Sequence, residues 1–371
     1  MTNKRQTSNG MRILAISGDR SRRGVLYAGS PAFKRQEAYA KQFGNLDVIV
    51  FSRRSDGATP MEASALRVYP TNSASRFFYG FDAIRIALKL PKPDVVTVQD
   101  PFEIGFVAWL IAALHGVSLH VQVHTDFLSP EYARLSFLNR IRVWVAGFVL
   151  RRASGVRVVS ERIKKDIEQT FRIRASITAL PIFVDVERFK TARSYLAISE
   201  RFAMFKTKVL VVSRLEPEKN VSLAIRAFAE AAPEDACLII VGAGSRALSL
   251  QHFAKRLNVA GRVFFEGSKD ASDYYRSCDL ILVPSKYEGY GLVTVEALSA
   301  GKPVLSTDVG IAREAGAIVT TEERFAEALA DWFKNGPRTG ELKNCPYANF
   351  EEYVHAYCND IMACTNGKKL P

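Results

Sequence analysis

The sequence of 371 residues has no apolar run long enough to cross a bilayer. A membrane-spanning helix needs about 20 apolar residues, and the longest candidate, residues 104–114, is far shorter. The first ten residues are polar and lack the apolar core of a secretory signal. The five cysteines are odd in number and form no Cys-x-x-Cys pair, which excludes a disulfide scaffold and indicates free thiols in a reducing compartment. We therefore expect a cytoplasmic protein.

Signatures for a metal ion or a nucleic acid are also missing. The nearest approach to an Asp-x-Asp metal motif is Asp185-Val186-Glu187, which is more simply explained as a turn. The sequence contains no helix-turn-helix pattern and no aromatic RNA-binding motif. We expect neither a bound metal nor a nucleic-acid partner.

Acidic residues are scarce in the first half of the chain. The net charge at pH 7 is +13, and residues 1–200 carry the whole excess, because residues 201–371 have as many Asp and Glu as Lys and Arg. A basic half indicates an anionic partner, such as an acidic membrane surface or a phosphorylated ligand. A solvated face that keeps the protein soluble is the alternative.

The rest of the composition is that of a globular protein, with 48% hydrophobic and 24% charged residues. The length favours two domains, since single cores rarely exceed about 250–300 residues. Short Val/Ile/Leu-rich runs alternate with longer amphipathic segments, which predicts doubly wound α/β units with parallel sheets. The expected strands are 11–17, 46–51, 94–100, 119–126, 156–160 and 177–183 in the first half, and 208–215, 237–242, 262–267, 280–285 and 303–308 in the second.

Domain boundaries follow from the places where the strand pattern lapses. Residues 186–206 lack such a pattern and are the expected linker between a first domain of residues 1–185 and a second of residues 207–340. Residues 341–371 contain a final predicted helix, 349–364. Ligands of open α/β sheets bind beyond the carboxyl ends of the strands, so two facing sheets would hold a ligand in a central cleft.

Residues 283–310, VPSKYEGYGLVTVEALSAGKPVLSTDVG, carry the densest pattern. A buried strand is followed by a loop with Glu288 and Gly291, and then by a helix that runs to Gly301 and contains Glu296. Glycines before a helix let backbone amides and the helix N-terminus approach an anion, and the two carboxylates suit a hydroxyl-rich ligand. The alternative is a set of ordinary loop glycines with solvated glutamates.

Residues 211–220, VVSRLEPEKN, place two cations after a strand. Arg214 and Lys219 flank a short loop before the next helix. A guanidinium fork and a mobile ammonium group at such a position suit a diphosphate. The alternative is an exposed basic loop in which the cations pair with Glu216 and Glu218.

In this order the motifs resemble the donor domain of retaining family-4 glycosyltransferases with the GT-B fold. The resemblance extends over about residues 11–335 and is denser in the second half. It implies an α/β architecture of two Rossmann-like, doubly wound parallel-sheet domains that face a central cleft. The segments that carry it are SRLEPEKN (213–220), LIIVGAGS (238–245), VFFEG (263–267) and the E-x7-E stretch 288–296 with its continuation to GKPV.

The resemblance also implies roles for residues of the second half. Arg214 and Lys219 would hold the donor pyrophosphate and stabilise the leaving nucleoside diphosphate, so that no metal ion is required. Glu288 would contact the transferred sugar, and Glu296 would accept hydrogen bonds from the ribose hydroxyls. The other donor-binding positions that the resemblance implies are Gly267, Gly291, Leu292 and Val293.

The first half is expected to bind the acceptor. In the loop 17–31, Gly24 is the nearest match to the family glycines that approach the donor phosphate, and the usual Gly-Gly pair is absent. His124 resembles the family histidine that contacts the donor sugar, and a satisfied structural histidine is the alternative. Asp126 is expected to orient His124 or the acceptor hydroxyl. Asp100 is expected to line the acceptor pocket, or more simply to cap a helix.

Residues 134–152 interleave aromatic and aliphatic side chains with arginines. Such a segment can lie on an anionic membrane and bring the active site to a lipid-linked acceptor. A core helix with solvated arginines is the alternative. By resemblance, the C-terminal helix is expected to return to the first domain.

The predicted function is transfer of a sugar, with retention, from a UDP- or GDP-sugar to a hydroxyl of a lipid-linked or polysaccharide precursor in cell-envelope biosynthesis. No cofactor is expected, and the enzyme is expected on the inner face of the membrane as a peripheral protein. A front-face route, in which the departing phosphate accepts the acceptor proton, is more consistent than a carboxylate nucleophile. Two alternatives remain open: a non-catalytic GT-B partner subunit, and a sugar-nucleotide epimerase of the same fold.

Overall fold

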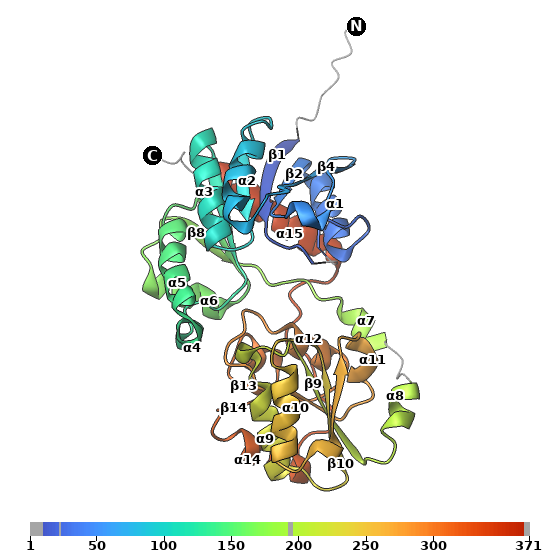
Figure 1. The fold of residues 1–371 in the computed structure, drawn as a ribbon. Helices are drawn as coiled ribbons and strands as arrows, with labels where there is room; N and C mark the ends of the chain where they lie inside the picture. Colours follow the sequence, from blue (N-terminus) through green and yellow to red (C-terminus); the bar gives the residue numbers. More distant parts are fainter. Residues whose placement is uncertain (1–9, 22–23, 192–195, 367–371) are drawn as a thin grey trace. The chain divides into compact units, whose positions relative to one another are not determined.

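The computed structural model describes residues 10–21, 24–191 and 196–366, and the chain forms two compact units (Figure 1). The first unit takes in the chain up to His124, Phe137–Pro181 and the chain from Asn349; the second is Thr125–Ser136 with Ile182–Ala348. Residues 1–9, on which the expectation of no secretory signal rests, lie outside the described residues, as do residues 22–23 of the loop 17–31.

The first unit is built on an eight-stranded sheet in the order β3-β4-β2-β1-β5-β6-β7-β8. Only the pair β3 and β4 is antiparallel, and the other neighbours are parallel. The strands are β1 (Met11–Ser17), β2 (Gly44–Val50), β3 (Met61–Ala63), β4 (Leu66–Pro70), β5 (Val95–Val98), β6 (Ser118–Val123), β7 (Gly155–Val158) and β8 (Ser176–Ala179). The principal helices are α1 (Pro31–Phe43), α2 (Tyr79–Ala87), α3 (Glu103–His115), α5 (Phe137–Leu150), α6 (Glu161–Thr170) and α15 (Phe350–Ala363).

The second unit has a six-stranded, all-parallel sheet in the order β11-β10-β9-β12-β13-β14. The strands are β9 (Thr207–Val212), β10 (Ala236–Val241), β11 (Val263–Gly267), β12 (Leu280–Val283), β13 (Val304–Thr307) and β14 (Ile318–Thr320). The helices are α4 (Pro130–Leu135), α7 (Val186–Thr191), α8 (Leu196–Arg201), α9 (Val221–Ala231), α10 (Ala247–Arg256), α11 (Ser272–Tyr275), α12 (Leu292–Ser299), α13 (Ala312–Ala315) and α14 (Phe325–Asn335). This strand order is the doubly wound order of dinucleotide-binding folds.

The sheet of the second unit separates two apolar cores. Val209 and Val211 of β9 pack in one cluster and Leu210 in the other, because successive side chains of a strand point to opposite faces. Burial on both faces explains why the strands read as continuous apolar runs. Every strand expected from the sequence is present, whereas the short strands β3, β4 and β14 were not predicted.

The expected linker, residues 186–206, is wrong as a boundary. Its described part forms α7 and α8, and Phe189, Ile198 and Phe202 are buried in a core of the second unit. Residues 192–195 lie outside the described part. The segment lacks strand periodicity because its apolar residues follow helical spacing, not because it is free of the core.

Residues 125–136 were also expected in the first domain, and this assignment is wrong. This segment belongs to the second unit, where the Tyr132 ring packs edge-on against Tyr287 with centroids 5.6 Å apart, and Lys286 lies 3.8 Å from Glu131. The segment 134–152 is therefore not one helix: it is interrupted at Ser136, where α4 has ended and α5 has not begun. Across the described ranges, none of the helices is long and apolar enough to span a membrane.

Candidate active site

In the second unit, the predicted phosphate-binding residues follow β9 and β12, the two neighbouring strands at which the strand order reverses. The chain winds from β9 to β10 and β11 on one side, and from β12 to β13 and β14 on the other. Ligands of such sheets bind in the crevice beyond the carboxyl ends of the two strands at this switch point. Arg214 and Lys219 follow β9, and Glu288 and Gly291 follow β12.

The two loops at this switch point are joined by a partly buried ion pair. Lys219 Nζ donates to Glu288 Oε1 at 2.5 Å, and Ser285 Oγ donates to the same oxygen at 2.8 Å. The Lys219 and Glu288 side chains are 16% and 18% exposed. The backbone N–H of Lys286 donates to the carbonyl of Glu218 at 2.8 Å. The structure therefore brings Lys219 and Glu288 together from loops that are distant in sequence.

Arg214 has a different environment. Its guanidinium donates to Glu218 Oε1 at 2.7 Å, and the side chain is 69% exposed. Glu218 is only 14% exposed, but the guanidinium itself lies in solvent, where charges are screened, so Arg214 can exchange Glu218 for another anion. Pairing with Glu218 was the alternative considered for Arg214, whereas Lys219 pairs with Glu288 and not with an acid of its own loop.

Gly291 is the residue from which α12 starts. Its φ of 97° is left-handed, a conformation that glycine adopts without strain. Leu292 and Val293 are the first residues of the helix, and amides in a first turn have no acceptor within their own helix. Positive potential from these amides therefore lies at the same end of the sheet as Lys219.

Glu296 and Gly267 complete the predicted donor-binding residues. Tyr275 donates its hydroxyl to Glu296 Oε2 at 2.7 Å, and burial raises the pKa of the Glu296 carboxyl above its ordinary value. Gly267 ends β11 with φ 71°, and its carbonyl accepts from Gly242 N at 2.7 Å. Tyr275 was missed from sequence, because nothing in the pattern YYRSC relates it to a glutamate that follows 21 positions later.

Gly242 is a second residue that sequence reasoning did not assign to the site. Its φ is 141°, and a Cβ there would lie 1.8 Å from the carbonyl oxygen of Ser213. Only glycine therefore lets the end of β10 approach the end of β9 this closely. The signal was the glycine that directly follows the apolar run CLIIV.

In the first unit, three predicted residues follow the neighbouring strands β1, β5 and β6. Gly24 is buried in a tight turn, where a Cβ would meet the carbonyl oxygens of Asp19 and Ser21 at 2.9 Å. Asp100 Oδ1 accepts from Phe102 N at 2.9 Å, and burial raises the pKa of Asp100 to about 6. Asp100 thus closes a turn before α3 and is not its N-cap, which is Phe102.

His124 follows β6 and is oriented by a residue that the sequence did not single out. Its Nε2 lies 3.3 Å from Oε1 of Gln122. Burial, followed by the charges of Arg157 and Arg35, lowers the pKa of His124 to about 3. Asp126, expected to orient this ring, is buried in the segment assigned to the second unit.

The chemistry of these residues is that of anion and hydroxyl binding. Of the residues that the structure describes, none form a group of three or more His, Cys, Asp or Glu that could hold a metal ion. Asp185 accepts from the backbone N–H of Arg188 at 3.2 Å, in keeping with a turn before α7. The five cysteines are free, and four of them are buried.

Two doubly wound parallel-sheet units define the GT-B class of glycosyltransferase folds. A solved structure with this fold is that of Alr3699/HepE from Anabaena in complex with UDP and glucose. It is similar to the present chain with a TM-score of 0.68 and 21% identity, and the match covers 96% of this chain and 97% of that one. The expected fold class is confirmed.

The family follows from the sequence models. The model "Glycosyltransferase Family 4" matches residues 38–188, and "Glycosyl transferases group 1" matches residues 198–347. Together they cover most of the chain, which therefore belongs to glycosyltransferase family 4, as the resemblance of its motifs implied.

Named relatives agree with this family. The alpha-monoglucosyldiacylglycerol synthase of Streptococcus pneumoniae is 25% identical over 327 residues, which cover 79% of this chain and 73% of the relative. The amylovoran biosynthesis glycosyltransferase AmsD of Erwinia amylovora is 25% identical over 265 residues, which cover 71% of this chain and 72% of the relative.

Proposed function

We propose that this chain is a retaining, metal-independent glycosyltransferase that moves a sugar from a UDP- or GDP-sugar to a hydroxyl acceptor. The observation that carries the proposal is the Lys219–Glu288 pair, which lies with Arg214 and the start of α12 at the switch point of the second unit. Breaking a sugar–phosphate bond develops negative charge on the diphosphate, and fixed cations and amide dipoles stabilise that charge.

The donor roles follow from these environments. Lys219 and Arg214 bind the pyrophosphate, and the amides of Leu292 and Val293 cradle a phosphate. Glu296 accepts hydrogen bonds from the ribose. Support for a nucleotide sugar comes from the Anabaena structure, whose ligands are UDP and glucose. The base is proposed to lie beside Gly267, and Gly24 is proposed as a further residue that binds the donor phosphate.

The environment of Glu288 argues against a role as nucleophile. Its Oε1 already accepts hydrogen bonds from Lys219 and Ser285, which lowers the nucleophilicity of that oxygen. We favour a front-face transfer, in which the bond from the anomeric carbon to the diphosphate breaks as the acceptor oxygen bonds to the same face. The acceptor proton then passes to a phosphate oxygen of the leaving group. Glu288 contacts the transferred sugar.

The acceptor is proposed to be a lipid-linked or polysaccharide precursor reached from an anionic membrane, because the first unit exposes an apolar surface. Residues of α5 spaced along one face are exposed, with Phe137 at 74% and Trp144 at 73%. Phe77 and Phe81, before and in α2, are 83% and 67% exposed, and Leu114 of α3 is 59% exposed. Helix α3 packs against both α2 and α5. Monomeric proteins rarely expose so many large apolar side chains together unless the surface binds something.

We call these exposed residues (Phe77, Phe81, Leu114, Phe137 and Trp144) the α2-α3-α5 surface. Basic side chains occur on the same helices or directly after them. Arg152 lies 3.6 Å from the ring centroid of Phe148 and 5.7 Å from that of Trp109. Arg85 and Lys89 are exposed at the end of α2. Exposed aromatic residues beside basic ones are the composition that binds the interface of an anionic bilayer. The names of the two relatives, one a glycolipid synthase and one an enzyme of amylovoran biosynthesis, are consistent with such an acceptor.

Turnover of single variants tests the donor site. A panel of UDP- and GDP-sugars is first assayed for release of nucleoside diphosphate in the presence of membrane extract, to identify the donor. Arg214→Ala and Lys219→Ala are then expected to lose about 2–4 kcal/mol of transition-state stabilisation, a fall of roughly 30- to 1,000-fold in kcat/KM. Lys255→Ala, which removes an exposed lysine of α10, is the matched control.

Two results would contradict the proposal. Near-equal rates for Arg214→Ala and the Lys255→Ala control would remove Arg214 from the mechanism. A wild-type protein that releases no nucleoside diphosphate from any donor, yet still binds UDP or GDP, would favour a non-catalytic partner subunit.

A further inference from the structure

The first unit contains a buried arginine without a carboxylate partner among the described residues. Arg157 of β7 is 1% exposed, and its hydrogen bonds go to neutral oxygens of Leu180, Pro181, Gln122 and Tyr353. Its guanidinium also lies 5.1 Å from the ring centroid of Tyr357. Burying a charge without a counter-charge costs free energy, so the burial of Arg157 needs a functional explanation.

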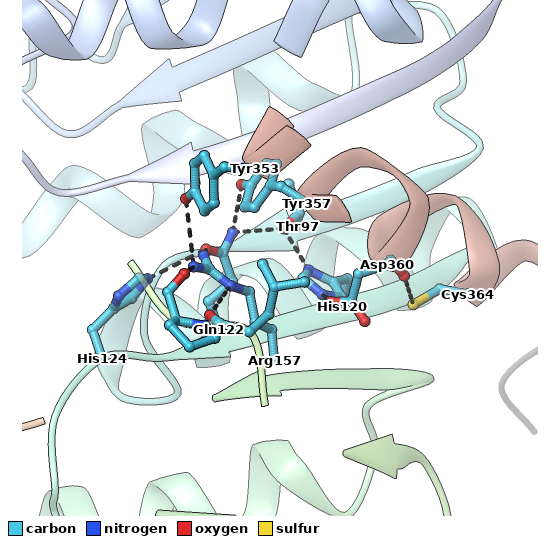
Figure 2. A network of polar contacts seen from close by, with 11 residues as sticks. Thr97, His120, Gln122, His124, Arg157, Tyr353, Tyr357, Asp360 and Cys364 are labelled. Atoms are coloured by element: carbon cyan, nitrogen blue, oxygen red, sulfur yellow. Dashed lines mark hydrogen bonds and ion pairs between the residues drawn. The ribbon is translucent and has the colours of Figure 1, made fainter. Parts of the chain in front are cut away.

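Arg157 fixes the orientation of the Gln122 amide, as Figure 2 shows. Guanidinium nitrogens can only donate, and Arg157 donates to Gln122 Oε1 at 2.9 Å. The amide nitrogen of Gln122 donates on its other side to the Tyr357 hydroxyl at 2.8 Å and to Thr97 Oγ1 at 3.2 Å. A flipped amide would point its N–H groups at the guanidinium, so only one orientation is compatible with Arg157.

This orientation decides the protonation of His124. The ring nitrogen Nε2 lies 3.3 Å from the same Gln122 Oε1, an oxygen that only accepts. Nε2 must therefore carry the hydrogen, and in the neutral ring Nδ1 then carries a lone pair. No hydrogen bond from a described residue reaches Nδ1.

Burial and the neighbouring charges keep the ring neutral. Burial lowers the pKa of His124 most, and the positive charges of Arg157 of β7 and Arg35 of α1 lower it further, to about 3. The C-terminal helix supports the arrangement, because Tyr357 of α15 accepts from Gln122 and stacks on Tyr39 of α1 at 4.1 Å between centroids.

The geometry points to Arg157 and Gln122 as positioning residues that hold His124 as the neutral Nε2–H tautomer, with Nδ1 presented to a sugar hydroxyl. His124 then accepts a hydrogen bond from the sugar and neither donates one to it nor transfers a proton. The part of the inference that concerns sugar rests on the proposed function, whereas the tautomer does not.

Nitrogen-15 NMR of the wild-type protein, labelled at histidine, tests the tautomer directly. The His124 resonances are identified by their loss in His124→Gln. We expect a neutral ring with the hydrogen on Nε2 throughout pH 5–8. A ring that carries its hydrogen on Nδ1, or one that titrates within this range, would overturn the inference without any variant of the network.

Arg157→Met tests the cause. Without the guanidinium the Gln122 amide is free to rotate, so we expect the Nδ1–H tautomer of His124 to appear alongside the Nε2–H form. Arg174→Met, at an exposed arginine of the same unit, is the matched control and should leave the spectrum unchanged. An unchanged tautomer in folded Arg157→Met would remove Arg157 from the role.

A conservative variant covers the case in which Arg157→Met does not fold. Gln122→Glu keeps an oxygen for both Arg157 and His124, so we expect the Nε2–H form to persist with a raised pKa. Appearance of the Nδ1–H form in Gln122→Glu would contradict the inference. All of these NMR spectra are recorded without substrate. A lack of transfer activity would therefore count against the proposed function and not against the tautomer.

Discussion

At the scale of single residues, burial and pairing decide how firmly each predicted phosphate-binding side chain is held in place. Lys219 and Arg214 look equivalent in the sequence. The structure places Lys219 in a pair with Glu288 in which both side chains are partly buried, while the Arg214 side chain is exposed and pairs with the mostly buried Glu218. A cation that is itself partly buried is oriented before any ligand arrives, whereas an exposed side chain loses more conformational freedom when the ligand binds.

Asp100 allows a test of how burial affects stability. The folded-state pKa of about 6 lies above the ordinary value of an aspartate, 3.8, so the folded protein binds more protons than the unfolded chain between these pH values. Stability linked to this group is therefore fully present below pH 3.8 and is lost as the pH rises through 6. Above pH 6 the ionised, buried carboxylate costs free energy.

We expect Asp100→Asn to increase the free energy of unfolding at pH 7 by about 1–3 kcal/mol. The gain should shrink to near zero below pH 4, because the wild-type carboxyl is then protonated in both states. Urea unfolding at pH 4, 5, 6 and 7 measures the difference. Asp331→Asn, at an exposed position of α14, is the control, and an Asp100→Asn gain that does not change with pH would contradict the prediction.

At the scale of elements, two segments took on roles that their sequence did not indicate. Helices α7 and α8 are part of a core of the second unit, although their residues were expected to form a linker. The segment 134–152 is divided between α4 and α5, which belong to different units. In both cases the partner surface, and not the local pattern, decided the assignment.

Helix α5 carries the membrane prediction. We expect the wild-type protein to sediment with vesicles that contain phosphatidylglycerol and to be released by salt. The double variant Phe137→Ser with Trp144→Ser should lower the partition coefficient at least about tenfold, since each large apolar side chain contributes roughly 1.5–3 kcal/mol when buried.

Leu248→Ser is the control for this experiment, because Leu248 of α10 is 71% exposed and lies in the second unit. Absence of wild-type binding at low salt, or an equal loss in Leu248→Ser, would leave the α2-α3-α5 surface as a solvated face.

At the scale of the whole molecule, charge and architecture divide the chain in a similar way. The excess of positive charge lies in residues 1–200, most of which belong to the first unit, while the proposed donor-binding residues other than Gly24 lie in the charge-balanced remainder. Attraction to an anionic surface and binding of a nucleoside diphosphate are therefore expected to be separable properties of this protein.

Nucleotide binding without a metal is the prediction at this scale. A ligand that binds only the folded state raises its stability by mass action, so UDP or GDP should raise the melting temperature by several degrees at millimolar concentration. The shift should be the same in EDTA and in magnesium, because Arg214, Lys219 and the α12 amides supply the positive charge. Thermal denaturation of wild type and Glu296→Ala measures it, and a shift that requires magnesium would contradict the prediction.

Eleven of the strands, the fold class, the family and the two motif loops could be predicted from the sequence by itself, whereas β3, β4, β14 and the helices α7 and α8 could not. Apolar runs, glycines and cations at strand ends are local features of the sequence. A strand that is buried on both faces of a parallel sheet is apolar along its whole length, so it can be recognised from its own residues. The Lys219–Glu288 pair, the Tyr275–Glu296 hydrogen bond and the Arg157–Gln122–His124 arrangement were decided by the tertiary structure alone. Gln122 and His124 are two residues apart, but the other partners come from elements or loops that are distant in sequence. A hydrogen bond between such partners depends on how the fold aligns those segments, which no local pattern predicts.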